Sequence, residues 1–155
     1  LQPGIGTGTV AVPRHVLARD GVTPTYGAPD TLELDAEWAD RAEIILERRG
    51  VAVRSGTHLT LTTLFAQDDA LCAGWAAQGI ATVDMETAVV AAVCARFGAR
   101  AIALLTAWDI LSEGHSFLDP IGAEEERALN HANDAIWGTA LDLATEVAAR
   151  RLGTA

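Results

Sequence analysis

Acidic side chains stand where two apolar segments of the sequence end. Residues 80–84 (IATVD) end in Asp84, and Glu86 opens the helical pattern that follows, while Asp109 comes shortly after the apolar residues 101–107. Ligands of open parallel sheets bind at the carboxyl ends of the strands, so these carboxylates are candidates for binding polar groups or exchanging protons. The structural alternative stays open, because Asp84 and Glu86 also suit a helix start and Asp109 a turn.

A glycine-rich loop is the second candidate for binding. Residues 4–9 (GIGTGT) combine exposed backbone amides with side-chain hydroxyls. Within this loop, Thr7 and Thr9 supply the hydroxyls, and Gly8 between them leaves the backbone amides accessible. Pro13 follows soon after and favours a turn over a central strand. The loop therefore predicts a binding segment near the start of the chain.

Hydrophobic periodicity predicts the elements that would position these groups. Helices are expected at residues 34–50, 67–79, 86–97 and 124–151, and strands at residues 21–26, 51–64, 80–84 and 101–107. Asp35 is the expected cap of the first helix. The third helix is apolar on nearly every face and is hence expected to be buried, and the fourth has an apolar stripe that includes Leu129, Ile136, Trp137 and Leu141. Apolar strands joined by a helix indicate parallel pairing with a right-handed crossover. The predicted fold is α/β, a mostly parallel central sheet flanked by helices on both faces.

The composition favours a single domain spanning residues 1–155, half of whose residues are hydrophobic. With 21 acidic and 11 basic residues, the net charge of −10 disfavours nucleic acid and anionic membranes as partners. Cys72 and Cys94 lie in apolar surroundings without metal-ligand spacing. They predict buried thiols in a reducing cytoplasm, with neither a disulfide nor a metal site.

The stretch around the two acids resembles a known family. Residues 83–88 (VDMETA), followed after a helix by a strand ending near Asp109, are similar to the signature of the nucleoside phosphorylase superfamily, which includes purine and uridine phosphorylases and methylthioadenosine-type nucleosidases. The resemblance implies that Met85 and Glu86 contact the ribose, with Glu86 accepting its hydroxyls. It also implies that Asp109 protonates or hydrogen-bonds the base. Asp84 is assigned to base binding as well. Such an acid neutralises the electron density that glycosidic cleavage leaves on the base.

The resemblance extends over nearly the whole chain. Residues 6–9 are similar to the family's glycine and hydroxyl loop, which implies that Thr7, Gly8 and Thr9 face the ribose and phosphate. Phe65 matches the family's base-stacking phenylalanine, with ordinary core packing as the alternative.

Some positions depart from the family pattern. Thr9 stands where the loop usually ends in glycine, Thr63 where an acid is common, Trp108 where a small residue is usual, and Gly4 near the phosphate-binding arginine of uridine phosphorylases. These differences predict an altered pocket and weaken the case for phosphate binding by this segment. His115 receives no role, because a lone loop histidine is more typical of a surface.

The resemblance implies cleavage of the N-glycosidic bond of a purine-type nucleoside, with phosphate as co-substrate and no other cofactor. Hydrolysis is the close alternative, and a non-catalytic nucleoside-binding or subunit-stabilising protein of the same fold is the third. The family fold begins with strands that precede the glycine loop, so the resemblance implies that these amino-terminal strands are missing from this chain. Because bare sheet edges are avoided, we expect a companion chain supplying the amino-terminal half, or a homo-oligomer.

Overall fold

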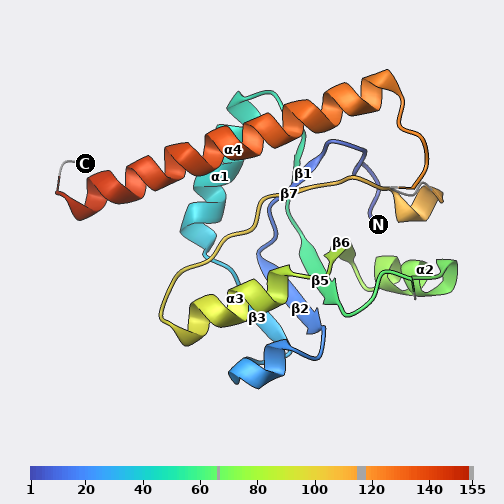
Figure 1. Cartoon of the computed structure of the whole chain (residues 1–155), viewed down its shortest axis with the longest axis horizontal. Coiled ribbons are helices and arrows are strands. Elements are labelled where there is room, and N and C mark those ends of the chain that lie inside the picture. Colours follow the sequence, from blue (N-terminus) through green and yellow to red (C-terminus); the bar gives the residue numbers. More distant parts are fainter. Residues whose placement is uncertain (66, 115–117, 154–155) are drawn as a thin grey trace.

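The computed structural model describes residues 1–65, 67–114 and 118–153 and has a mixed α/β fold (Figure 1). The described strands are β1 (Val10–Ala11), β2 (His15–Arg19), β3 (Thr31–Glu33), β4 (Val53–Arg54), β5 (Thr57–Leu61), β6 (Ile80–Asp84) and β7 (Leu105–Thr106). The described helices are α1 (Ala36–Arg48), α2 (Asp69–Ala77), α3 (Thr87–Arg96) and α4 (Ala123–Arg151), with 3-10 turns η1 (Thr23–Tyr26) and η2 (Leu111–Glu113). The predicted α/β class is confirmed.

The strands form two sheets, in the orders β4-β1-β7 and β3-β2-β5-β6. β1 pairs in parallel with β4, and their continuations β2 and β5 also pair in parallel. Bends separate the two sheets at Pro13, which has no N–H for a ladder bond, and at Gly56, where a Cβ would lie 2.9 Å from the Cβ of Ala81. The predicted strand over residues 51–64 is therefore interrupted, and the expected single sheet is divided in two.

Antiparallel strands occupy one edge of each sheet. β7 runs antiparallel to β1, and β3 runs antiparallel to β2. The predicted parallel unit of residues 80–107 is wrong in this respect, because β6 and β7 belong to different sheets. Of residues 101–107 only Leu105 and Thr106 form a strand, where β1 offers its free side.

The predicted strand at residues 21–26 is also wrong. Asp20 accepts hydrogen bonds from the backbone N–H groups of Val22 and Thr23 at 2.6 Å each, and from the Thr23 hydroxyl at 2.7 Å. These bonds close a tight turn that leads into η1. A short polar side chain that satisfies nearby backbone groups thus replaces the ladder bonds of a strand.

All four predicted helices are present, and Asp35 caps α1 by accepting a hydrogen bond from Trp38 N at 3.0 Å. The predicted burial of the helix over residues 86–97 is wrong, because Val90 of α3 and the Phe97 that follows it are exposed. On α4, Trp137 and Leu141 of the predicted apolar stripe are exposed, whereas Leu129 is buried. The buried face of α4 instead consists of Leu129, Ala132, Ala135, Thr139 and Leu143. Small residues let this helix lie close to α1 and the first sheet, so the larger side chains face outward.

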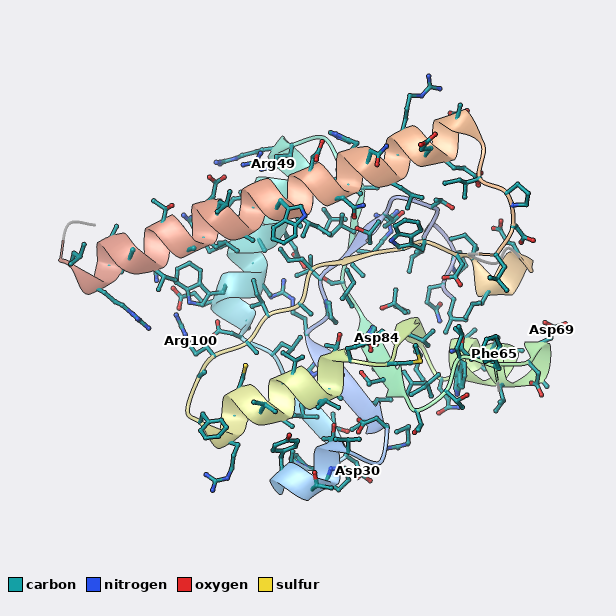
Figure 2. All side chains as sticks on the ribbon, viewed as in Figure 1. Asp30, Arg49, Phe65, Asp69, Asp84 and Arg100 are labelled. Atoms are coloured by element: carbon teal, nitrogen blue, oxygen red, sulfur yellow. The ribbon has the colours of Figure 1, made fainter. Side chains whose placement is uncertain are left out.

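Charged side chains join α1 to α4 on the outside of the molecule. Arg49 crosses α4 close to Gly138 and pairs with Asp142 at 2.7 Å (Figure 2). At the other end of α1, the guanidinium groups of Arg100 and Arg150 lie 5.3 Å and 4.6 Å from the ring of Trp38.

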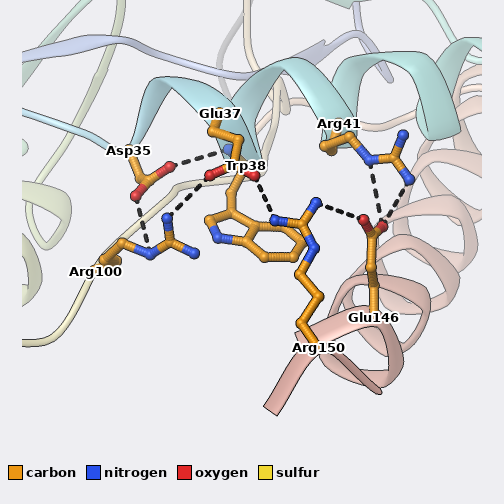
Figure 3. A network of polar contacts seen from close by, with 7 residues as sticks. All are labelled: Asp35, Glu37, Trp38, Arg41, Arg100, Glu146 and Arg150. Atoms are coloured by element: carbon orange, nitrogen blue, oxygen red, sulfur yellow. Dashed lines mark hydrogen bonds and ion pairs between the residues drawn. The ribbon is translucent and has the colours of Figure 1, made fainter. Parts of the chain in front are cut away.

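Acidic partners complete this network (Figure 3). Glu37 binds both Arg100 and Arg150, and Glu146 binds Arg41 at 2.8 Å. Exposed ion pairs contribute little one at a time, but a shared network around a buried tryptophan fixes how the two helices meet.

Of the two cysteines, only Cys72 is buried as predicted. Cys72 is buried, Cys94 is half-buried, and both are free thiols. Among the described residues, no helix is long and apolar enough to cross a membrane.

Replacement of Gly8 by alanine should destabilise the protein more than replacement of Gly27. Both glycines have positive φ, +81° and +73°, which costs an L-residue about 1–2 kcal/mol. Only at Gly8 would the added Cβ also lie 2.9 Å from the backbone of Ala128 in α4, whereas nothing lies within 4 Å at Gly27. Urea unfolding of Gly8→Ala should therefore show about 1–3 kcal/mol of loss beyond that of Gly27→Ala. Equal losses would mean that the loop does not pack tightly against α4.

Candidate functional site

A cavity of about 430 Å³ lies where β6 and β7 end, next to the first half of α4. Its lining includes residues 81–84 and Glu86, residues 104–109, and Asn133, Ile136 and Trp137 of α4. The carboxylates of Glu86 and Asp109, predicted from two separate segments, therefore face one space. Its volume lies within the range of small-molecule sites in proteins.

The Asp84 carboxylate is held by groups from two elements, β5 and α3. The Thr60 hydroxyl of β5 donates to Oδ1 at 2.8 Å, and the Thr87 backbone N–H at the start of α3 donates to Oδ2 at 3.0 Å. The Thr87 hydroxyl also donates to Oδ2. Thr60 Oγ1 in turn accepts from Ala88 N at 2.9 Å. The register that pairs Thr60 with Asp84 across β5 and β6 makes this arrangement possible.

A fully buried histidine stands next to this carboxylate. His58 Nδ1 lies 2.8 Å from Thr82 Oγ1, and His58 Nε2 lies 2.8 Å from Asp84 Oδ1. The second approach is close, but its direction departs from that of an aligned hydrogen bond, so it acts chiefly as an electrostatic contact.

These contacts set the ionisation of Asp84. Burial disfavours its charged form, but the close electrostatic contact with His58, together with the hydrogen bonds from Thr87 and Thr60, outweighs burial and lowers its pKa to about 2. Asp84 is therefore an ionised acceptor whose oxygens are bound by the protein itself. The structure supports the capping interpretation of Asp84, and its assignment to base binding stays a prediction.

Glu86 has a different environment from Asp84. It is the exposed N-cap residue of α3, and its Oε2 accepts a hydrogen bond from Met85 N at 3.1 Å. Met85 is 38% exposed and is not among the lining residues of the cavity. Of the predicted ribose pair, the structure thus brings Glu86 to the cavity and leaves Met85 beside it.

Asp109 is half-buried, and its neighbour Trp108 is exposed at the cavity. The segment before them is tied to the glycine loop, because Gly8 N donates to Ala107 O at 2.9 Å and Ala107 N donates to Thr9 O at 2.8 Å. The loop therefore sets the position from which Asp109 reaches the cavity.

Thr7, Gly8 and Thr9 lie next to the cavity but do not line it. Thr7 is half-buried, and Thr9 is buried with its hydroxyl accepting a hydrogen bond from Gly6 N at 3.0 Å. This internal bond explains the position of Thr9 without a ligand. Contact of the loop with ribose or phosphate stays a prediction.

Phe65 is far from buried, with 89% of its surface exposed. It lies beside α2, on the segment that leaves β5 (Figure 2). The structure does not bring Phe65 to the cavity, and the core-packing alternative is wrong at this exposure. Stacking of Phe65 on a base stays a prediction.

Sequence reasoning missed several residues of this region. His58 and Thr60 alternate with apolar Leu59 on β5, and Asn133 reaches the cavity from α4, where its Oδ1 accepts from the Thr106 hydroxyl at 3.0 Å. The signal was a pair of polar residues at i and i+2 within an otherwise buried strand. His115 lies outside the described residues. Within the described residues, no three His, Cys, Asp or Glu side chains gather as metal ligands would.

Comparison with known proteins identifies the family of the chain. The family model of the phosphorylase superfamily matches residues 1–141. The chain belongs to this superfamily. A purine nucleoside phosphorylase of the DeoD type from Alkaliphilus metalliredigens is 35% identical over 74 residues, which make up 48% of this chain and 32% of that relative.

Two solved structures show the same fold at low sequence identity. The 5′-methylthioadenosine/S-adenosyl homocysteine nucleosidase of Campylobacter jejuni is 18% identical with a TM-score of 0.68, over 94% of this chain and 65% of its own. The purine nucleoside phosphorylase of Toxoplasma gondii, in complex with immucillin-H, is 16% identical with a TM-score of 0.72, over 92% and 59%. The chain thus spans less than two thirds of the length of each of these three relatives.

The stability provided by Asp84 should depend on pH. Its folded pKa of about 2 lies below the ordinary value of 3.8, so its contribution is complete above about pH 5 and is lost as the pH falls through 2. In chemical denaturation, the advantage of the wild type over Asp84→Asn should shrink by up to about 2 kcal/mol between pH 5 and pH 2. Thr60→Val, which keeps the carboxyl and removes one donor, should retain part of this pH dependence. Parallel pH profiles for wild type and Asp84→Asn would contradict the assignment.

Proposed function

We propose that this chain carries the ribose and base side of an enzyme that cleaves the N-glycosidic bond of a purine-type nucleoside. The observation that carries the proposal is the shared cavity of Glu86 and Asp109, in a chain of the phosphorylase superfamily. The two carboxylates come from the ends of β6 and of the segment that contains β7, so the fold offers two acidic groups to one small molecule.

Glu86 is suited to hold a sugar. Its carboxylate is exposed at the cavity and has only the adjacent Met85 N–H as a described hydrogen-bond donor, so it retains acceptor capacity for two neighbouring hydroxyls. Charge-assisted bonds of this kind are stronger than neutral ones. Met85, half-exposed beside it, is proposed to pack against the sugar ring.

Asp109 is proposed to assist departure of the base. As the bond between C1′ and the base nitrogen breaks, its electron pair moves onto the base, and a proton or hydrogen bond from Asp109 neutralises it. The nucleophile adds to C1′ on the opposite side. Trp108 and Trp137 also line the cavity and offer aromatic faces to a planar base.

The nucleophile distinguishes two versions of the proposal. Phosphorolysis is favoured by the DeoD-type relative and has phosphate as co-substrate. Hydrolysis is the second candidate, because the described residues lining the cavity include no arginine and the sequence contains no lysine. No cationic side chain in this part of the cavity is thus available to neutralise a phosphate.

A partner for the chain is also proposed, as a companion polypeptide or a second copy. Residues 101–103 are extended and half-buried, and their described backbone–backbone hydrogen bond is the one that Ala101 O accepts from Asp35 N at 2.8 Å. A half-buried segment with so few ladder bonds favours pairing with another strand.

The test is release of free base from adenosine, inosine, guanosine and methylthioadenosine, each with and without phosphate, with the mass of the active species measured by light scattering. Release that requires phosphate supports phosphorolysis, and equal release without phosphate supports hydrolysis. Binding without release would leave a non-catalytic nucleoside-binding protein. Neither binding nor release, in the chain alone or with added partner, would refute the proposal.

Glu86→Gln should lower kcat/KM by about a hundredfold while leaving the thermal midpoint nearly unchanged. A neutral amide forms weaker bonds to the two ribose hydroxyls than the carboxylate does, and each charge-assisted bond contributes about 1.5–3 kcal/mol. Steady-state kinetics and a melting curve measure both quantities. Glu124→Gln, which changes an exposed glutamate in the first turn of α4, is the control and should leave kcat/KM intact. Unchanged kinetics in Glu86→Gln would remove the ribose assignment.

Asp109→Asn should reduce turnover of natural nucleosides by about a hundredfold or more, the usual contribution of a positioned acid. The loss should be much smaller for a nitrophenyl riboside, whose leaving group departs without a proton. Comparing kcat for the two substrates isolates the proton transfer. Equal losses on both would show that Asp109 acts on something other than the departing base.

A further inference from the structure

His58 is a fully buried titratable side chain that the proposed chemistry does not use. It sits in the middle of β5, and its ring lies between Thr82 and Asp84, which point to the same face of β6. Burial of an imidazole is unfavourable unless polar partners surround it. A histidine here therefore has a polar task, since an aliphatic residue would fill a strand interior at lower cost.

The partners determine the proton on the ring. Ionised Asp84 only accepts, so His58 Nε2, 2.8 Å from Oδ1, carries hydrogen, while Nδ1 shares a proton with the Thr82 hydroxyl in either direction. The ring thus connects Thr82 to the carboxylate and keeps a positive dipole against it.

Asp84 in turn shapes the turn that presents Glu86. Its Oδ2 accepts from Thr87 N and closes residues 84–87, with Glu86 inside at φ −128° and ψ −36°. Any shift of the Asp84 carboxylate moves the start of α3, and with it the backbone from which Glu86 reaches the cavity.

We infer that His58 is a positioning residue that holds Asp84 in place and thereby sets how tightly Glu86 binds the two ribose hydroxyls. This inference rests on the proposed function. His58 borders the cavity but is fully buried, and its polar contacts are with Thr82 and Asp84, so it acts through Asp84. It contributes to discrimination between sugars, and the proton donated to the base comes from elsewhere.

Two substitutions separate this role from packing. The amide nitrogen of His58→Gln reaches about as far as Nε2 and keeps a donor for Asp84, whereas that of His58→Asn reaches only as far as Nδ1. The readout is the ratio of the dissociation constants of 2′,3′-dideoxyadenosine and adenosine, measured by calorimetry, together with KM and kcat. We expect His58→Asn to lower the ratio about tenfold and to raise KM more than it lowers kcat, and His58→Gln to stay within about threefold of wild type.

Leu59→Ala is the matched control, because Leu59 is buried on the opposite face of the same strand. It should lower the thermal midpoint and leave the ratio unchanged. If His58→Asn behaves as Leu59→Ala does, the histidine is a packing residue and the inference is overturned. If His58→Asn does not fold, Thr82→Val is the substitute, because it removes the hydroxyl that orients the His58 ring. Thr82→Val should lower the ratio of dissociation constants by a smaller factor. An unchanged ratio in Thr82→Val would overturn the inference.

Failure of the proposed function would be recognised separately, as a wild type that binds neither nucleoside. In that event, hydrogen exchange at two amides tests the contact between His58 and Asp84 without a ligand. The amide of Thr87 donates to Asp84, and the amide of Ala88 donates to Thr60. Faster exchange in His58→Asn than in His58→Gln would support the link from His58 to the start of α3. Equal exchange would overturn it.

Discussion

The rest of the site depends on how the half-buried carboxylate of Asp84 is satisfied. An ionised acid that is partly withdrawn from water is stabilised by donors around it, and here the donors come from β5 and from the start of α3. The hydrogen bonds to Asp84 therefore link β6 to β5 and to the start of α3. These bonds also fix the backbone of Glu86, two residues after Asp84, and thereby its position at the cavity.

Asp109 reaches the same cavity by a different route. The bends at Pro13 and Gly56 divide the strands into two sheets, so β6 and β7 are not neighbours in one ladder. Instead, the glycine loop bonds to Ala107 and holds the end of β7 from the side. Glu86 and Asp109 are thus positioned by independent constraints, the hydrogen-bonded carboxylate of Asp84 for the first and a tightly packed loop for the second.

The outer network around Trp38 supports this arrangement from a distance. Arg100, at the start of the segment that leads to Asp109, is bound to Asp35 and Glu37 at the beginning of α1. Arg150 near the end of α4 lies over the same tryptophan ring. The helix that lines the cavity and the segment that carries Asp109 are therefore fixed to the same surface of α1.

The sequence by itself determined the α/β class and the extent of the helices, and it singled out Glu86 and Asp109 as candidates, because caps, glycine stops and apolar runs are local signals. It did not predict the division of the sheet, the exposure of Phe65 and Trp137, or the contact between His58 and Asp84. Those features arise from register and close approach between segments far apart in the chain, as where Gly56 meets Ala81 and β5 pairs with β6. Only the tertiary structure decided them, since no local pattern specifies which distant strand, helix or charge a side chain will meet.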